Sequence, residues 1–444
     1  MQSKSAFIFK EHSWNPKKAQ ATFSYQIIQS DHVFDFVEKL WFPLARPVAE
    51  IPPMLLKNTL DSLLLVLGIS YYKLFCPKEL VLSNVVLSKK QADFWNTLYT
   101  KGLGELFYKN KIDFRGLISF PFSENNNQVS VKFSRKDRLL LGIGGGKDSI
   151  VAGEILKKMG KSFSAFVVNN HSIQAQTMQL LGIDGLMINR EIDPLLLDLN
   201  KRSDIYNGHV PVSSQTAFIA LFSALLFDYK YIVMANEQSA NYGSVKYLGQ
   251  DINHQWSKSY EFEQLFQNYV KSYITTDVYY FSLLRPFNEI AIVEMFSQYK
   301  KYLNEFSSCN RNFRIKEKAQ KKWCGKCPKC AFTFAMLSAF LPKKELLNIF
   351  GQNLFAREDL IQVYKELLGV INLKPFDCVG TPDEVKVAFY LALQKGEYDG
   401  DPVMELFQKD VLPKISDVEL LKEQVFFKSE KHSIPKSFQE AQNI

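Results

Sequence analysis

The most constraining feature of this sequence is an alternation of short apolar strands and longer helical segments that begins near residue 136. Apolar runs predict buried strands at "RLLLGI", "FSAFVVNN", "GLMINR" and "KYIVMAN", and helical segments such as "SIVAGEILKKMG" lie between them. Strands that alternate with helices form parallel sheets with helices on both faces. We therefore expect an α/β fold with a doubly wound parallel sheet in the middle of the chain.

A glycine-rich loop, "GIGGGKDS", joins the first of these strands to its helix. The dinucleotide fingerprint fails here because Lys147 stands where the last glycine is required. The kinase-type phosphate loop also fails, because Asp148 follows Lys147 where that motif needs Ser or Thr. What remains is a nest of backbone N–H groups before a helix that we expect to begin near Ser149, an arrangement that suits pyrophosphate. The candidate ligands of the phosphates and of Mg²⁺ are Gly144, Gly145, Gly146, Lys147, Asp148 and Ser149.

This loop resembles the PP-loop of the ATP pyrophosphatase superfamily, whose usual form is S-G-G-x-D-S. Gly144 stands in place of the first serine, which removes one hydroxyl from the loop. The resemblance implies that ATP is cleaved between its α- and β-phosphates, with adenylation of a substrate and release of pyrophosphate. It also places adenine near the end of the next strand, at Val167, Val168 and Asn169.

Four of the six cysteines are clustered late in the chain, three of them at C-x₂-C-x₂-C spacing in "WCGKCPKC". Such spacing lets thiolates converge on one tetrahedral metal ion, and a closed four-cysteine site has a structural rather than a catalytic role. We expect zinc, although an iron–sulfur cluster uses the same ligands and buried free thiols are a further alternative. The candidate metal ligands are Cys309, Cys324, Cys327 and Cys330. A very similar arrangement closes 7-cyano-7-deazaguanine synthase, another PP-loop enzyme.

Other polar segments supply candidate site residues. In "MANEQSANYGS", Glu237 follows a strand at the edge where open α/β sheets bind ligands, so it is a candidate second Mg²⁺ ligand or a solvated loop carboxylate. The segment "DINHQWSKSYEFE" is rich in proton-transfer groups interleaved with aromatic residues, which favours a lined pocket over a solvated surface. Ser213 or Ser214 is the expected N-cap of the apolar helix that follows "NGHVPV".

An ordered set of stretches resembles the UDP-N-acetylmuramoyl-L-alanyl-L-glutamate epimerases, from about Phe23 to Cys378. The resemblance implies that, with ATP and Mg²⁺, the terminal L-Glu of a UDP-linked muramoyl dipeptide becomes D-Glu, with release of AMP and pyrophosphate. The product serves peptidoglycan synthesis, and hence cell-wall biogenesis and cell shape. The stretches that carry the resemblance are "GLGELFYKN", "LGIGGGKDS", "NGHVPVSSQTAFIALFSALL", "ANEQSAN", "NHQWSKSYEFE", "LLRPFNEIA", "SCNRNFR" and "WCGKCPKCAFTF".

The implied chemistry is sound on elementary grounds. A Cα–H bond beside a carboxylate is a very poor acid, and conversion of the carboxylate to an acyl-adenylate removes the charge that opposes deprotonation. A base then takes the proton, and reprotonation on the opposite face inverts the centre. We expect His254 and Lys258 to transfer this proton, with Glu261 as a third candidate. Arg285, Arg311 and Arg314 are candidates to bind a carboxylate or the UDP phosphates.

The remaining features bear on organisation and location. We expect an N-terminal α+β region over 1–134, an ATP-binding domain over 135–300, and the metal site with a helical region over 301–444. A net charge of +8 is mild for 444 residues, so no nucleic-acid partner is expected. The N-terminus does not read as a signal peptide and the longest apolar block, at 62–70, is too short to span a bilayer. We expect a cytoplasmic protein without membrane insertion.

Two other interpretations remain open. One is a different PP-loop adenylating enzyme that modifies a nucleobase or tRNA, similar to the deazaguanine synthase, although a tRNA enzyme normally shows a strong basic region or an RNA-binding module. The other is a non-catalytic, zinc-stabilised nucleotide-binding protein, which would bind ATP without consuming it.

Overall fold

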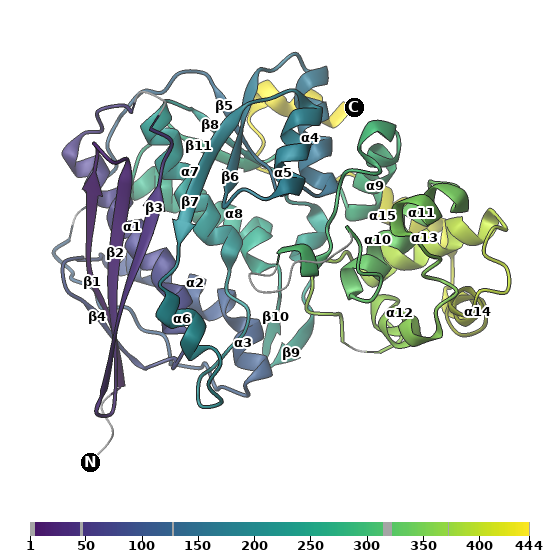
Figure 1. Cartoon of the computed structure of the whole chain (residues 1–444), viewed down its shortest axis with the longest axis horizontal. Helices are drawn as coiled ribbons and strands as arrows, with labels where there is room; N and C mark the ends of the chain where they lie inside the picture. Colours follow the sequence, from purple (N-terminus) through teal and green to yellow (C-terminus); the bar gives the residue numbers. More distant parts are fainter. Residues whose placement is uncertain (1–4, 45–47, 127, 314–321, 372, 444) are drawn as a thin grey trace.

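The computed structural model describes residues 5–44, 48–126, 128–313, 322–371 and 373–443. Figure 1 shows a part built around one large sheet, with a helical part beside it that holds most of the last third of the chain.

The strands are β1 (Ser5–Asn15), β2 (Gln20–Gln29), β3 (His32–Trp41), β4 (Glu79–Leu82), β5 (Leu139–Gly142), β6 (Phe163–Val168), β7 (Gly185–Glu191), β8 (Tyr231–Met234), β9 (Val245–Tyr247), β10 (Gln250–Ile252) and β11 (Tyr279–Ser282). The α-helices are α1 (Pro53–Tyr72), α2 (Lys89–Gly102), α3 (Gly104–Lys109), α4 (Lys147–Lys158), α5 (Ser172–Leu181), α6 (Pro194–Leu199), α7 (Val212–Phe227), α8 (Tyr260–Tyr273), α9 (Glu289–Ser297), α10 (Pro328–Ser338), α11 (Lys343–Phe350), α12 (Ile361–Leu367), α13 (Pro382–Gln394), α14 (Pro402–Leu406) and α15 (Val418–Phe426).

The large sheet has the strand order β11-β8-β5-β6-β7-β3-β2-β1-β4. The strands from β11 to β7 are parallel to one another, whereas β3 pairs antiparallel with the end of β7 and β1 to β3 form an antiparallel meander. The α/β class is therefore confirmed. The N-terminal strands, expected as a region of their own, extend the same sheet, and the division into three domains stays a prediction.

Helices cover both faces of the parallel strands, as alternate residues of β5 demonstrate. Leu140 belongs to one buried core, together with side chains of α1, α7 and α8. Leu139 and Leu141 belong to a second core, with side chains of α4, α9 and the helical part. Each such leucine contributes about 1.5–3 kcal/mol when fully buried. Apolar residues on both sides of a strand explain why "RLLLGI" reads as a continuous apolar run.

Helix α1 is long and apolar enough to cross a membrane by length and composition alone. However, 83% of its most apolar window is buried inside the protein. It packs against α7 and under β1 and β2, where Tyr25 of β2 donates a hydrogen bond to the carbonyl of Leu64 at 3.0 Å. This burial is typical of the core helix of a soluble protein.

One predicted helix start is confirmed and one predicted helix cap is wrong. Helix α4 begins at Lys147, within two residues of Ser149, with Gly146 at the N-cap position. Helix α7 begins directly after Pro211, so the two serines expected to cap it lie in its first turn. There the hydroxyl of Ser214 donates to the carbonyl of Pro211 at 2.7 Å, instead of accepting from a backbone N–H.

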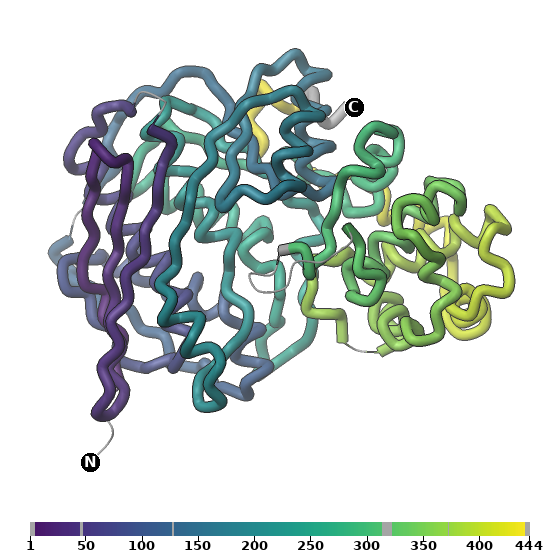
Figure 2. Tube along the Cα trace, viewed as in Figure 1, coloured from purple at the N-terminus to yellow at the C-terminus, as the bar shows by residue number. Residues whose placement is uncertain are grey.

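The helical part confirms the expected helical C-terminal region, and its end returns to the sheet. Figure 2 shows the yellow C-terminal segment beside the parallel strands as well as in the helical part. The Phe438 ring packs edge-on against Tyr231 of β8, with ring centroids 5.0 Å apart, and contacts Phe281 of β11 at 5.1 Å. The last segment thus ties the helical part to the strands that carry the site.

Candidate functional site

A cavity of about 400 Å³ opens at the carboxyl ends of β5, β6 and β8. Because β6 lies on one side of β5 and β8 on the other, this is the point where the strand order reverses. Open α/β sheets bind ligands at such a point. The lining includes Gly142, Ile143, Gly144, Gly146, Asp148, Ser149, Phe166, Val168, Asn169, Gln174, Arg190, Ser213, Thr216, Met234, Asn236 and Lys258.

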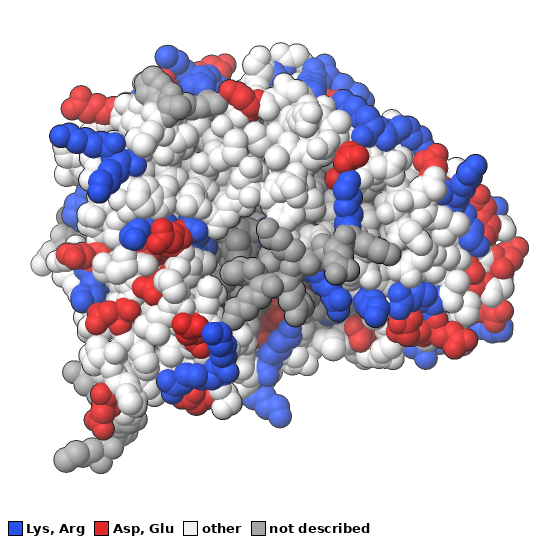
Figure 3. Space-filling model, viewed as in Figure 1, with Lys and Arg blue, Asp and Glu red and all other residues white. Residues whose placement is uncertain are grey.

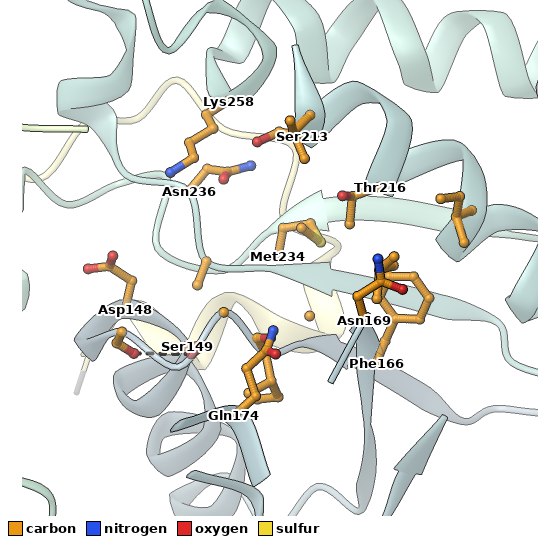
Figure 4. Close-up of a pocket in the computed structure, with 18 of the residues that line it drawn as sticks. Asp148, Ser149, Phe166, Asn169, Gln174, Ser213, Thr216, Met234, Asn236 and Lys258 are labelled. Carbon is orange, nitrogen blue, oxygen red and sulfur yellow. Dashed lines mark hydrogen bonds between the residues drawn. The ribbon is translucent and has the colours of Figure 1, made fainter. Parts of the chain in front are cut away.

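The two ends of the cavity differ in chemistry. Figure 4 shows Asp148 and Ser149 at one end, with the side chains of Asn236 and Lys258 above them. Phe166 lies at the other end, beside Asn169. One end therefore presents charged side chains, and the other presents an aromatic ring.

The glycine loop needs its glycines where the chain turns toward α4. Gly145 has a φ of +82°, and a Cβ atom there would meet Cγ2 of Ile173 at 2.8 Å. A Cβ atom on Gly146 would meet Oγ of Ser308 at 3.0 Å. The Ser149 hydroxyl donates to the carbonyl of Gly146 at 3.1 Å, inside the first turn of α4. The N-terminus of this helix faces the cavity and contributes a partial positive charge.

Three carboxylates gather beside the loop. Each of Asp148, Glu237 and Glu289 offers an oxygen atom within 4.8 Å of the others. Burial, and then the nearby Glu289 carboxylate, raise the pKa of Glu237. Oε2 of Glu289 is buried without a hydrogen-bond partner among the described residues. Crowded carboxylates with a free buried oxygen fit a divalent cation such as Mg²⁺.

Buried lysines balance part of this negative charge. Lys147, buried in the first turn of α4, donates to Oε1 of Glu289 at 2.7 Å and also pairs with Asp148. Nζ of Lys329, on α10, lies 3.6 Å from the same Glu289 oxygen. Although burial raises the pKa of Glu289, these two lysines outweigh it and lower that pKa. Lys147 therefore orders the carboxylates and does not line the cavity.

A chain of ionisable groups extends from the cavity toward the helical part. Nζ of Lys258 lies 3.5 Å from Sγ of Cys378, which is partly exposed. His254 lies beside the same thiol and pairs through Nδ1 with the buried carboxylate of Glu105. The ring of His209 packs against that of His254, with centroids 4.3 Å apart.

The pKa shifts favour the charged forms of Lys258, Cys378 and His254, whereas burial lowers the pKa of His209 to about 3 and leaves it neutral. Burial alone would lower the pKa of His254, but hydrogen bonds with Cys378 and Glu105 raise it to about 9. Burial raises the pKa of the Cys378 thiol, yet the Lys258 ammonium and then His254 outweigh it and lower the pKa to about 6. The thiolate in turn raises the pKa of Lys258. At neutral pH the chain therefore holds a thiolate between an ammonium and an imidazolium.

The four clustered cysteines converge as the spacing predicts. Their sulfurs all lie within 4.8 Å of one another, with Sγ of Cys330 3.5 Å from that of Cys327 and 3.7 Å from that of Cys324. Four thiolates around one zinc ion, at a Zn–S distance of about 2.3 Å, place the sulfurs about 3.8 Å apart. The donors present therefore fit a tetrahedral metal ion.

The cysteine cluster also lies next to the phosphate loop. The N–H of Ser307, two residues before Cys309, donates to the carbonyl of Gly145 at 3.4 Å. Helix α10 starts directly after Cys327 and carries Lys329 toward Glu289. A metal held by the cysteines would fix both of these segments against the site.

Comparison with known proteins gives a consistent result over almost the whole chain. The family model described as MurL N-terminal domain matches residues 1–283, and the one described as MurL C-terminal domain matches residues 305–421. The chain belongs to the MurL family. No solved structure matches it.

Curated relatives of this MurL chain share its length. A protein of Xanthomonas oryzae pv. oryzae (strain MAFF 311018) is 33% identical over 97% of this chain and 95% of its own length. One of Micromonospora sp. (strain ATCC 39149 / NRRL 15099 / SCC 1413) is 34% identical over 98% of this chain and 97% of its own length. Each is named UDP-N-acetyl-alpha-D-muramoyl-L-alanyl-L-glutamate epimerase.

Several predicted residues of this MurL chain lie on the cavity. Val168 and Asn169 line it next to Phe166, together with the loop residues named above. Asn169 has a φ of +53°, and its amide is occupied in a pair of hydrogen bonds with the backbone of Arg190. That side chain therefore shapes the wall of the cavity by linking the ends of β6 and β7.

Other predicted residues lie elsewhere. Arg285 is fully buried: its guanidinium binds Glu263 and donates to the carbonyls of Glu237 and Lys258, both at 2.7 Å. It thus supports two site segments from behind. Glu261 is about half exposed in a different surface hollow, where it accepts hydrogen bonds from Trp256 and Lys101.

The last two predicted arginines follow Cys309. Arg311 is exposed in a short 3₁₀ helix, Asn310–Phe313, and Arg314 lies outside the described residues.

Figure 3 shows that the described basic and acidic side chains are interspersed over this face of the molecule. The expectation of no nucleic-acid partner stays a prediction.

The structure adds residues that the sequence analysis did not select. Glu289 and Glu105 join their partners only through the fold, and the isolated cysteine Cys378 carried no motif of its own. The stretches "GLGELFYKN" and "LLRPFNEIA" contain both carboxylates, so the resemblance held a signal for them. For Cys378 the only hint was its position at the end of the region of resemblance.

Proposed function

We propose that this chain is an epimerase that converts the terminal L-glutamate of UDP-N-acetylmuramoyl-L-alanyl-L-glutamate to D-glutamate, at the expense of ATP. The observation that carries the proposal is the full-length similarity to proteins named for that activity. The cavity on the parallel sheet supports the ATP part of the proposal, because it combines a glycine-rich loop, a helix N-terminus and a group of carboxylates.

In this proposal, the triphosphate lies at the end of the cavity formed by Asp148 and Ser149, and adenine lies near Phe166 and Val168. Asp148, Glu237 and Glu289 would hold Mg²⁺, which supplies charge neutralisation for the departing pyrophosphate. The glutamate carboxylate attacks the α-phosphate of ATP and forms an acyl-adenylate with release of pyrophosphate. The proposal includes a PP-loop ATP pyrophosphatase fold, which the resemblance of the glycine loop supports.

Inversion follows at the Cα atom of the activated residue. Lys258 lines the cavity next to the phosphate end, and His254 is linked to it through Cys378. Both are protonated at neutral pH, so we assign them as acids that stabilise or reprotonate the enolate. We assign Arg285 a positioning role behind Lys258. The four cysteines would hold a structural zinc ion.

The proposal is tested by exchange of labelled pyrophosphate into ATP. We expect exchange that requires Mg²⁺ and the UDP-linked L-Ala-L-Glu substrate, because adenylation is reversible. Exchange that requires tRNA instead would favour the alternative of a tRNA-modifying enzyme. ATP binding without exchange or hydrolysis under any of these conditions would favour the non-catalytic alternative.

A further inference from the structure

We propose that Cys378 is a catalytic residue, whose thiolate removes the Cα proton of the activated glutamate residue. This inference rests on the proposed function, since it names the base for the inversion that the acyl-adenylate makes possible. Neither the sequence motifs nor the names of the relatives assign a role to this cysteine.

The loop between α12 and α13 fixes the position of this thiol. The carboxylate of Asp377 accepts a hydrogen bond from the N–H of Cys378 at 2.8 Å, and Lys329 donates to the carbonyl of Cys378. The next carbonyl, of Val379, accepts from Nε2 of Gln255 at 3.1 Å. The backbone of Cys378 is therefore held on both sides, which fixes the sulfur next to Lys258.

The neighbours of the sulfur make it the base of the group. Lys258 connects it to the cavity at 3.5 Å, and His254 approaches from the β-sheet part with Glu105 behind it. Both neighbours already carry a proton at neutral pH and cannot accept another. His209 is also deprotonated at neutral pH, because burial lowers its pKa to about 3, but it packs against His254. The thiolate is the deprotonated group of this chain that contacts Lys258, the residue that lines the cavity.

More distant charges act in both directions. Lys329 and Lys374 add positive charge from the helical part and favour the thiolate. Beyond Lys258 lie the carboxylates of Glu237 and Asp148, which interact with the same ammonium. The nearest charges are cations, so the thiolate remains the favoured form.

The step balances without an added reactant. The Cys378 thiolate takes the proton from Cα, and the electron pair of the C–H bond moves into the acyl-adenylate carbonyl to give an enolate. A protonated neighbour, Lys258 or His254, returns a proton to the opposite face of Cα, and the electron pair moves back. The new Cys378 thiol then passes its proton to that neighbour, so the site is restored before water releases AMP and the D-product.

The test compares Cys378→Ala and Cys378→Ser with Cys76→Ala, which removes a buried thiol in the segment between α1 and β4. Two readouts are measured with ATP, Mg²⁺ and the UDP-linked dipeptide: pyrophosphate exchange into ATP, and deuterium uptake at Cα in D₂O. We expect both Cys378 variants to keep exchange within about threefold and to lose uptake by about 10²–10⁴-fold. Cys76→Ala should keep both.

The two readouts distinguish failure of the proposed function from failure of the role proposed for Cys378. Absence of exchange in the unmodified enzyme contradicts the proposed function. Exchange with deuterium uptake that persists in Cys378→Ala overturns the role of the thiol, and so does a covalent thioester between Cys378 and the glutamate, detected by intact-protein mass.

A measurement on the unmodified enzyme tests the inference even if the Cys378 variants fail to fold. Iodoacetamide modification of Cys378, followed by peptide mass spectrometry, should rise with pH around a midpoint near 6 and be slowed by ATP with the dipeptide. A midpoint at or above the ordinary cysteine value of about 8.5 would overturn the inference.

Discussion

Nζ of Lys258 lies 3.5 Å from Sγ of Cys378, although the two residues are 120 positions apart in the chain. Lys258 lines the cavity on the sheet, whereas Cys378 belongs to the loop before α13 in the helical part. The contact therefore joins the two parts of the molecule at one place. It places a thiolate next to the protonated amine that lines the phosphate end of the cavity, where the activated substrate is formed in our account.

Replacement of Lys258 tests this contact. Lys258→Met removes the cation that most lowers the pKa of Cys378, so the thiolate becomes less stable and the thiol pKa rises from about 6. The midpoint of Cys378 alkylation should move to higher pH by at least one unit. Lys90→Met, at an exposed position of α2, is the matched control and should leave the midpoint unchanged. An unchanged midpoint in Lys258→Met would show that the amine does not stabilise the thiolate.

The pH dependence of deuterium uptake follows from the same charges. The thiolate is lost as the pH falls through about 6, and the imidazolium of His254 is lost as the pH rises through about 9. Uptake should therefore have a bell-shaped profile with limbs near these values. Glu105→Gln removes the anion behind His254, which lowers its pKa and moves the alkaline limb to lower pH. An alkaline limb unaffected by this variant contradicts the assignment to His254.

Two glycine substitutions, one in the phosphate loop and one beyond the far end of α4, test the role of the loop. Gly145→Ala places a Cβ atom 2.8 Å from Ile173 at a φ of +82°, so the loop must move. We expect KM for ATP to rise at least about tenfold, because each 1.4 kcal/mol of lost binding is a factor of ten. Gly160→Ala has a similar positive φ but open space around it, and lies at the far end of α4. It should cost stability alone, and equal effects on KM would contradict the role of the loop.

The clustered carboxylates of Asp148, Glu237 and Glu289 predict a requirement for a divalent cation. Asp148→Asn should reduce substrate-dependent AMP formation about 100-fold and raise the Mg²⁺ concentration needed for half-maximal rate. Glu154→Gln, on the same helix but paired with Lys301, should leave both values unchanged. The measurement is AMP release over a Mg²⁺ titration. A variant with wild-type Mg²⁺ dependence would remove Asp148 from the cation site.

The cysteine cluster predicts about one zinc ion per chain. Cys327→Ser should lose the metal and lower the melting temperature, because a structural zinc site contributes to folding itself. The segment that carries Cys309 also contacts the glycine loop, so loss of the metal should weaken ATP binding. Metal analysis by mass spectrometry gives the content, with Cys76→Ser as the control. Iron and labile sulfide in the purified protein would instead show that the four cysteines hold an iron–sulfur cluster.

Much of the central fold could be predicted from local patterns. The parallel strands β5, β6 and β8 read as apolar runs because both of their faces are largely covered, and the glycine loop marks where β5 meets α4. The join between β3 and β7 could not be predicted, because it depends on a few residues, Lys39–Trp41 with Asn189–Glu191. No local pattern specifies pairing over that separation.

The candidate site was likewise only partly predictable from the sequence. Cys309 could be matched with the later cysteines because metal ligands follow known spacings. Glu289 and Cys378 could not be found in this way, because their chemistry comes from neighbours distant in sequence. Arg285 illustrates the opposite error: a conspicuous arginine after an apolar run proved to be buried against Glu263, since a charged side chain at a strand end can serve packing as well as ligands.

The most direct test of the account is to follow AMP and the configuration of the terminal glutamate together. The enzyme is incubated in D₂O with Mg²⁺ and UDP-N-acetylmuramoyl-L-alanyl-L-glutamate, with and without ATP. The account predicts D-glutamate that carries deuterium at Cα and appears with AMP and pyrophosphate, and no D-glutamate when ATP is left out. D-glutamate formed without ATP, or AMP formed without any inversion, would contradict it.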